Sequence, residues 1–497
     1  MGGARRGTVW VVDPPDPRLE GEWRPVPGPV DRESFDRAQR RHRRASWRWT
    51  LACAIAIALI GIPLSAALSP LLVAVAVILN DLANLVIHTP DLLGPFRDAL
   101  ENDRVADVPR LVVTVVVVLV VPGAVALTAA WVAVRRLFRH AGTEAELLAM
   151  GAREPRPGDR EEHQLVNVVS EIAIAGGLPP PPVYVVDSPV ANAAVTGSSP
   201  DDAAVVVSRG LLDGLNREET QGVVAHLLGR VGNGDLAIAR TIASLYYTLG
   251  LCSAVLTAPT ERRARRALGP ILRLLVRPRS AAHEPERAKA AALALLEAQG
   301  GGGGETVEAK GCLSVLLLPL MAAQLAFVMN QLLFSLFLVN PILRRAWRAR
   351  SALADATAVE LTRYPDGLAA GLVALIRCGG VVPGTEPVAH LFVVGPQASA
   401  PADPKHDSPL AGFQPKMERR LSRLQAMGAT VEFDEGDRRL GVGAKLLLVV
   451  VGGPFVVLFY VLMLGISVAM TGIAFALYMM FLVGPVLVLD SLLRGGS

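Results

Sequence analysis

The sequence predicts a membrane protein in which a mostly helical α+β domain with a small β-sheet lies among about four to six transmembrane helices. Three observations predict this fold class. Hydrophobic residues make up 52% of the 497 residues, charged residues only 19%, and the mean hydropathy is +0.41, whereas soluble domains are about 25% charged. Five long runs contain no charged residue. The polar blocks between them combine helical periodicity with short β-rich pieces.

The same composition excludes several other classes. It does not fit a chain that is disordered over most of its length, a coiled coil or a collagen-like fibre. The net charge of +4 reflects arginine-rich segments beside the membrane, so nucleic acid is not an expected partner. No disulfide framework or cysteine zinc site is expected, because no CxxC pair occurs among Cys53, Cys252, Cys312 and Cys378.

Residues 1–48 are predicted to form a disordered, Pro- and Arg-rich cytosolic tail. The first 30 residues are proline-rich, and arginines cluster at 37–48. The arginine cluster is expected at the cytosolic membrane surface, although a solvated charge run that only sets the topology would look the same. The stretch is too long and polar for a cleaved signal peptide.

The charge-free runs divide the rest of the chain, because a helix needs about 20 apolar residues to span a bilayer. We expect two transmembrane helices and an external loop in 49–134, membrane helices around a basic Gly-rich insert in 241–343, and a C-terminal membrane hairpin or helices in 446–497. The run at 241–260 is marginal in length. Polar residues in the fourth run are expected to hydrogen-bond between helices: Gln324, Asn330 and Gln331.

Arginines at the ends of the runs predict the orientation. Arg135, Arg136 and Arg139 follow the second run, which indicates a cytosolic N-terminus and a cytosolic main domain. The basic segment 259–312 conflicts with this rule if the third and fourth runs each cross once. The Ala, Val, Arg and Gly bias suggests a GC-rich bacterial genome, and hence the plasma membrane.

The two polar blocks, 135–240 and 344–445, contain recognisable local patterns. In the first, an amphipathic helix is expected at 160–175, followed by β-rich pieces at 183–187, 191–196 and 203–208. A further helix, capped by Asn216 with Glu219 three residues on, is expected to run past Asp235 into the third apolar run. The second block is expected to begin with a helix through 352–361 and to end with a basic helix at 415–427.

These blocks carry a resemblance to a known family. The matching segments are VYVVDSPVANAAVTG (183–197), AAVVVSRGLLDGLNREE (203–219), VVAHLLGRVGNGD (223–235), ARSALADATAVELT (349–362), HLFVVGP (390–396) and PKMERRLSRLQAMG (415–428). In order, spacing and flanking apolar runs, the chain resembles the membrane-embedded zinc endopeptidases of the HtpX and CAAX-prenyl-protease type. The resemblance covers about 135–430 and implies a zincin-like domain in two parts, 135–240 and 344–445.

The catalytic motif of that family is degenerate here. The family uses HExxH on a helix, with two His as zinc ligands and Glu as the base, and takes a third ligand from the Glu of a later ExxxD motif. The resemblance places HLLGR at 226–230 on this motif. His226 then stands for the first ligand, and Asp355 and Asp235 keep the family's acidic positions. The base and the other two ligands are replaced by Leu227, Arg230 and Ser351.

These replacements predict that no metal is bound and no residue is catalytic. One imidazole does not hold zinc, and Arg230 places a permanent cation near the expected dication. Arg230 would take the place of the metal charge by pairing with Asp355 or Asp235. In the alternative, His226 and Asp355 form a buried structural pair.

A rebuilt zinc site and serine catalysis are two other possible chemistries. A rebuilt zinc site would have to draw on His390, His406, Asp235, Glu360 and Asp355, none of which lies at the i, i+4 position from His226. Serine catalysis has no GxSxG motif, and Ser351 has no nearby Lys or His in the sequence. The stretch at Asn192, Ala193 and Ala194 resembles the family's substrate-binding edge strand, and a peptide can add to such an edge without being cut; Asn192 can also be a simple turn residue.

Three functions follow. The first is a catalytically inactive relative of the zinc endopeptidases that binds protein or peptide segments or regulates membrane partners. The second is an active zinc metalloendopeptidase that cleaves membrane or misfolded proteins through a non-standard ligand set, and it alone requires zinc. The third is a structural membrane component with a docking scaffold. Whether the chain is an enzyme is left open by the sequence, with the missing base and ligands favouring the first function.

Overall fold

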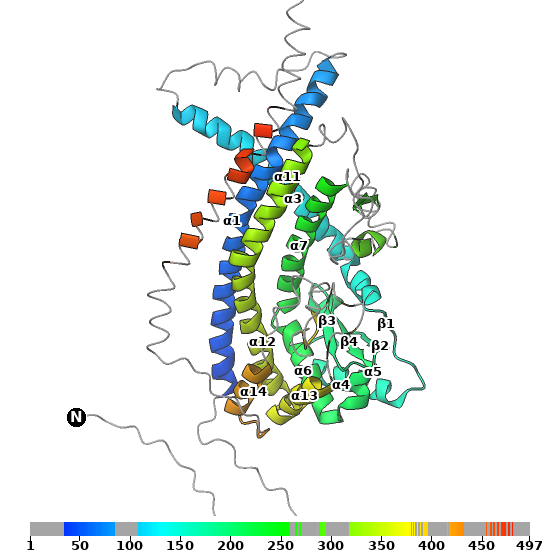
Figure 1. Ribbon diagram of the computed structural model, residues 1–497. Helices are drawn as coiled ribbons and strands as arrows, with labels where there is room; N and C mark the ends of the chain where they lie inside the picture. The colour runs from blue at the N-terminus through cyan, green and yellow to red at the C-terminus, as the bar shows by residue number, and fades with distance from the viewer. Residues whose placement is uncertain are drawn as a thin grey trace, which may run out of the picture.

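The computed structural model describes residues 34–84, 108–258, 318–378 and 417–431, together with scattered residues within 264–294, 380–415 and 454–480. Its long helices form one end of the molecule, a small sheet with its covering helices lies at the other end, and α1 extends along both (Figure 1). The long helices are α1 (Phe35–Asn84), α3 (Val108–Ala149), α7 (Asp235–Thr257) and α11 (Leu318–Phe334).

Four helical segments of the described residues are long and apolar enough to cross a membrane. They are Arg37–Val73, Val120–Arg139, Asp235–Thr257 and Gln324–Thr362. Each contains most of one of the first four predicted runs, including the marginal third run. The predicted mostly helical membrane architecture with a small sheet is therefore confirmed in outline, while the run at 446–489 lies largely outside the described residues.

Helix α1 begins well inside the segment predicted to be a disordered tail. The side-chain amide of Gln39 donates hydrogen bonds to Thr357 Oγ1 (3.1 Å) and Glu360 Oε2 (2.6 Å), and Ala38 and Ser46 are buried. The prediction for 1–48 is thus wrong from Phe35 onward, because a distant helix supplies partners for this polar segment. The proline-rich residues 1–33 lie outside the described residues.

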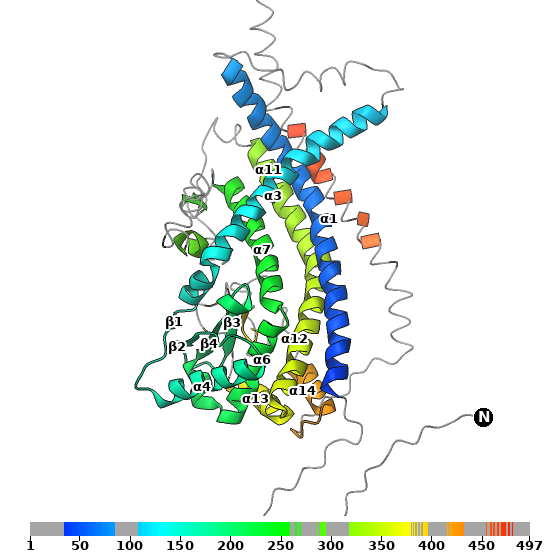
Figure 2. The same cartoon turned by 180° about the vertical axis from the view of Figure 1, so that it is seen from behind.

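A single helical path joins the fourth apolar run to the second polar block. Helix α11 passes through the π-helical turn η5 (Ser335–Val339) into α12 (Asn340–Thr362). The domain boundary predicted between residues 343 and 344 therefore falls inside one helix. Helix α12 lies alongside α1 in both views (Figures 1 and 2), so both helices run from the membrane-spanning end to the sheet-bearing end.

The sheet has four strands in the order β1-β2-β4-β3. Strand β4 (Ala204–Ser208) is parallel to β2 (Val183–Val186) and antiparallel to β3 (Ala193–Thr196), and β1 (Ala152–Arg153) is antiparallel to β2. The three longer strands coincide with the predicted β-rich pieces. The sequence did not reveal β1, because two residues are too few to show alternation.

Both faces of the sheet are buried, which explains its runs of valine and alanine. Val205 and Val207 pack into the core formed with the covering helices, whereas Val206 and Ala204 pack with residues of α3 and α7. The covering helices are α4 (Arg160–Ala175), α5 (Arg209–Gly214), α6 (Arg217–Gly232), α13 (Pro365–Cys378) and α14 (Met417–Ala426).

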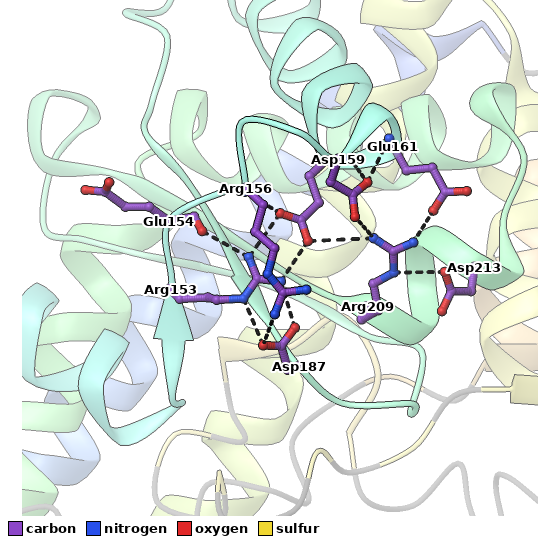
Figure 3. Close-up of polar contacts among 9 residues, drawn as sticks. Arg153, Glu154, Arg156, Asp159, Glu161, Asp187, Arg209 and Asp213 are labelled. Atoms are coloured by element: carbon purple, nitrogen blue, oxygen red, sulfur yellow. Dashed lines mark hydrogen bonds and ion pairs between the residues drawn. The ribbon is translucent and has the colours of Figure 1, made fainter.

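An ion-pair network fixes β1 and β2 to the starts of α4 and α5 (Figure 3). Arg153 donates to both oxygens of the buried Glu162 carboxylate, at 2.7 and 3.0 Å, and to Asp187 at 2.7 and 2.8 Å. Arg209 donates hydrogen bonds to Asp159, Glu161 and Asp213, and its Nη1 is also 3.7 Å from Glu162 Oε1. The network fixes the starts of α4 and α5 relative to strands β1 and β2.

Helices α6 and α7 are separate, contrary to the single helix expected from Asn216 through Asp235. Gly234 lies between them with a φ of 72°, in the left-handed region that favours glycine. The chain changes direction there, so α7 leaves α6 and enters the membrane-spanning bundle. The break also places Asp235 at the first turn of α7, facing the end of α6.

Candidate functional site

Helix α6 carries three of the predicted site residues into the core. Its start is fixed by a capping box in which the Asn216 side chain accepts from the Glu219 N–H (2.9 Å) and the Glu219 carboxylate accepts from the Asn216 N–H (2.9 Å). At Gly222 a Cβ would lie 2.4 Å from Leu368 N, so α13 packs directly against the α6 backbone. The helix therefore holds His226, Leu227 and Arg230 at 5% exposure or less.

The imidazole of His226 contacts a buried acid and a buried base. Its Nδ1 lies 2.8 Å from Asp355 Oδ1 on α12. Arg420 of α14 reaches the same carboxylate through Nη2–Oδ1 (2.7 Å) and Nε–Oδ2 (3.1 Å), and its Nη2 is 3.2 Å from His226 Nδ1. Three helices thus meet at one fully buried His–Asp–Arg cluster.

Burial and the neighbouring charges keep His226 neutral. Burial and, to a smaller extent, the positive charge of Arg420 lower the pKa of His226, the Asp355 carboxylate opposes both effects, and the net pKa is about 4. A neutral imidazole that donates from Nδ1 to a carboxylate keeps its Nε2 lone pair free to accept. This is the arrangement in which a histidine ligates a metal or accepts a hydrogen bond.

Leu227 and Arg230 are residue types that do not ligate metal ions in proteins. Leu227 is completely buried among apolar side chains and offers neither a donor nor an acceptor. Arg230 donates from Nη1 to the Leu391 carbonyl at 2.8 Å, and its guanidinium carbon lies 6.0 Å from the centre of the Trp347 ring. Burial lowers the pKa of Arg230, and the nearby Arg420 and Arg350 add to this effect.

A second buried ion pair lies at the junction of α6 and α7. Arg350 Nη2 is 2.6 Å from Asp235 Oδ1, and Arg350 Nη1 donates to Ser46 Oγ of α1 at 3.0 Å. Ser351, the next residue on α12, is 7% exposed, and its Oγ has no hydrogen-bond partner among the described residues. Arg350 therefore joins the membrane helix α1 to the site through Asp235.

A small, partly open pocket separates these groups. It has room for about one water molecule. The residues around it include the first-ligand position, two replaced ligand positions and the second ion pair: His226, Arg230, Ser351, Asp235, Arg350 and Trp347.

The structure distinguishes the pairings that the sequence left open. Asp355 contacts His226 and Arg420, and Asp235 contacts Arg350. Within the described part of the chain, Arg230 forms an ion pair with neither acid. Sequence reasoning missed Arg420 and Arg350 as site residues, although both lie in segments that carry the family resemblance, at 415–428 and 349–362.

The candidate residues for a rebuilt metal site do not converge in the described part of the chain. His226 and Asp235 share the pocket, but Glu360 is hydrogen-bonded to Gln39 at another position on α12. No group of three or more His, Cys, Asp or Glu residues suitable for a metal occurs in the ranges that the structure describes. His390 and His406 fall outside those ranges.

The expected peptide-binding edge is covered by the chain itself. Asn192, Ala193 and Ala194 are buried, and Ala194 forms a β-bridge with Phe392. The Val393 N–H donates to the Ala193 carbonyl at 2.8 Å.

The Asn192 side chain strengthens this contact. Its amide donates to the Val394 carbonyl (2.9 Å) and the Gly380 carbonyl (2.8 Å), and its Oδ1 accepts from the Val394 N–H (3.2 Å). The outer edge of β3 is therefore not free as the sequence suggested, because a segment 200 residues away in the chain docks on it.

Comparison with known proteins gives a consistent result. Residues 159–428 match the model of peptidase family M48. The chain is 30% identical over 286 residues to the Protease HtpX homolog of Dictyoglomus turgidum, a match that covers 56% of this chain and 73% of the relative. It is 31% identical over 288 residues to the Protease HtpX homolog of Streptococcus thermophilus, with 57% and 80% covered.

Proposed function

Because the chain belongs to peptidase family M48, we propose that it is a catalytically inactive, membrane-embedded member that binds or regulates membrane-protein partners instead of cutting them. The observation that carries this proposal is the pair of buried side chains Leu227 and Arg230. Where the family's motif places a base and a ligand, this chain places an alkyl group and a guanidinium.

The residues around the pocket do not fit a zinc ion. Protein zinc sites use at least three protein ligands, and among the described residues only His226 and Asp235 line this pocket with side chains of the usual ligand types. Two guanidinium groups, from Arg230 and Arg350, line the same pocket and would repel a dication.

The remaining part of the family's arrangement supports a structural use of the site. The His226–Asp355 contact has the form of a metal ligand held by a second carboxylate, and Arg420 neutralises that carboxylate. With zinc replaced, the buried cations and acids pair with one another across α6, α12 and α14. The site then serves to hold the helices of the domain together.

The proposal extends to location and partners. Four apolar helices among the described residues support a multi-pass protein in the lipid bilayer. We place it in the plasma membrane with the N-terminus and main domain in the cytosol. The partners are protein or peptide segments, and nucleic acid is not among them. No cofactor is required.

The alternative function is an active zinc metalloendopeptidase that uses a non-standard ligand set. It is favoured by the protease names of the relatives. His390 and His406, the two other histidines that could serve as zinc ligands in such a set, lie outside the described residues.

Metal content separates the two functions. Detergent-purified full-length protein is measured by elemental mass spectrometry beside the triple variant Leu227→Glu, Arg230→His, Ser351→Glu, which restores the family's motif. We expect no zinc in the natural protein, about one zinc per chain in the triple variant, and hydrolysis of an unfolded protein substrate only in the latter. Stoichiometric zinc in the natural protein that His226→Ala removes would overturn the proposal.

A further inference from the structure

The pocket between α6 and α12 lies in an excess of buried positive charge. Arg350 is paired with Asp235, and Arg420 is paired with Asp355. Arg230 is 5% exposed and has the Leu391 carbonyl and the Trp347 ring as neighbours, with no carboxylate at ion-pair distance among the described residues. The Asp235 carboxylate raises the pKa of Arg230, but it is also the ion-pair partner of Arg350, so two guanidinium groups share one acid. This excess of buried positive charge is costly and favours a further negative partner.

Two hydrogen-bond donors beside Arg230 also lack partners. Ser351 Oγ and Arg350 Nε are buried, and neither has a hydrogen-bond acceptor in the described part of the chain. Both residues line the pocket together with Arg230. Asp235 Oδ1, on the same pocket, is a buried acceptor without a hydrogen bond in the described part of the chain. Buried polar groups are nearly always satisfied in folded proteins, so a group inside the pocket would serve the two donors.

Size and shape limit what that group can be. The space holds about one water molecule and is partly open. A sulfate or phosphate ion, with four oxygens, is too large. A halide ion or a single carboxylate group that enters from the open side has the required charge, acceptor capacity and size.

We propose that this pocket binds one small monoanion, either a free ion of chloride or formate size or the terminal carboxylate of a longer molecule such as a peptide. Arg230 supplies the charge, and Ser351 and Arg350 supply hydrogen bonds. The proposal rests on the proposed function in one respect, since the anion occupies space that zinc would need. His226 is neutral and Asp235 is neutralised by Arg350, so neither repels the anion strongly.

The test measures thermal unfolding of the detergent-purified full chain at constant ionic strength. Sodium methanesulfonate is replaced stepwise by sodium chloride, formate, acetate or butyrate. A ligand that binds only the folded state raises Tm in a saturable manner. We expect such a rise for chloride and formate. A rise with acetate and butyrate as well identifies the open side as a site for a terminal carboxylate, and its absence identifies a site for free ions.

Variants locate the effect. Arg230→Met keeps an unbranched apolar side chain without the charge and is expected to weaken the apparent anion affinity by about tenfold or more, because hydrogen bonds to charged groups are stronger than neutral ones. Arg217→Met is the matched control, because Arg217 lies on the same helix in an exposed ion pair with Glu171. Ser351→Ala, a minimal change, is expected to weaken binding less and to preserve folding.

The outcomes are separable from those of the proposed function. If no anion raises Tm in a saturable manner, or if Arg230→Met responds to every anion as the natural protein and Arg217→Met do, the anion site does not exist. Zinc content is measured on the same preparations. Bound zinc contradicts the proposed function, whereas a zinc-free protein without an anion response contradicts this inference alone.

Discussion

Arg420 Nη2 lies 2.7 Å from Asp355 Oδ1, so a guanidinium from α14 and a carboxylate from α12 form an ion pair in which both side chains are 1% exposed. The same carboxylate is 2.8 Å from His226 Nδ1 of α6. A single buried acid therefore holds together three helices from both polar blocks of the sequence. The stability of the domain should depend strongly on this acid and its partners.

Arg420→Met should destabilise the domain severely. Removing one partner of a buried pair leaves an uncompensated charge, which typically costs about 3–5 kcal/mol. The free energy of unfolding in urea, measured in detergent, should fall by this amount. Arg419→Met is the control on the same helix because Arg419 is exposed, and equal effects of the two changes would contradict the importance of the ion pair.

Acid should destabilise the protein through His226. The pKa of this group is about 4 in the folded chain, below the value of 6.5 for an unhindered histidine. The unfolded chain therefore binds more protons between these values. The contribution of His226 to the free energy of unfolding should be fully present above pH 6.5. It should fall by up to about 3 kcal/mol as the pH drops towards 4.

Two glutamine variants isolate this contribution. His226→Gln should flatten the dependence of unfolding on pH between 6.5 and 4, measured by urea titrations at several pH values. His163→Gln, which changes an exposed histidine of α4, should keep the slope of the natural protein. Identical slopes in the natural protein and His226→Gln would mean that another group controls the acid response.

The break between α6 and α7 gives a prediction from a matched pair of glycines. Gly234→Ala places a side chain in the left-handed region and should destabilise by about 1–2 kcal/mol, even though nothing lies within 4 Å of the new Cβ. Gly232→Ala changes a helical glycine whose Cβ would lie 3.8 Å from Leu178, and should be neutral or stabilise by up to about 1 kcal/mol. Thermal unfolding of both variants tests the difference.

Asn192→Ala should release the segment that covers the edge of β3. It removes the side-chain hydrogen bonds to the backbone of Val394 and Gly380, a loss of about 2–3 kcal/mol. The hydrogen-exchange rates of the Val393 and Val394 amides should rise by at least the factor that corresponds to this loss of free energy. Asn167→Ala, at an exposed position of α4, is the control. Unchanged exchange in Asn192→Ala would show that backbone pairing alone holds the segment.

The network in Figure 3 should contain one strong contact among weak ones. Arg153→Met leaves the buried Glu162 carboxylate without its two-point partner and should destabilise by about 3 kcal/mol. Arg156→Met removes an exposed pair with Asp187 and should change stability by less than about 1 kcal/mol. Urea unfolding compares the two, and equal losses would argue that Arg209 also neutralises Glu162.

Local patterns in the sequence were enough to predict several elements. The helix at 160–175 and the strands near 183–187, 191–196 and 203–208 are found where alternation and capping residues placed them. The first four apolar runs coincide with the candidate membrane helices. The assignment of Leu227 and Arg230 to the positions of the family's base and second ligand comes from the family resemblance and stays a prediction.

The tertiary structure decided the contacts between distant segments. Arg420 with Asp355, Arg350 with Asp235, and Phe392 against Ala194 join residues 65 to more than 100 positions apart. The helical start at Phe35 depends in the same way on partners in α12. Periodicity and capping act over a few residues and fix local conformation. The partner of a buried charge depends on how whole helices pack, which no local pattern records.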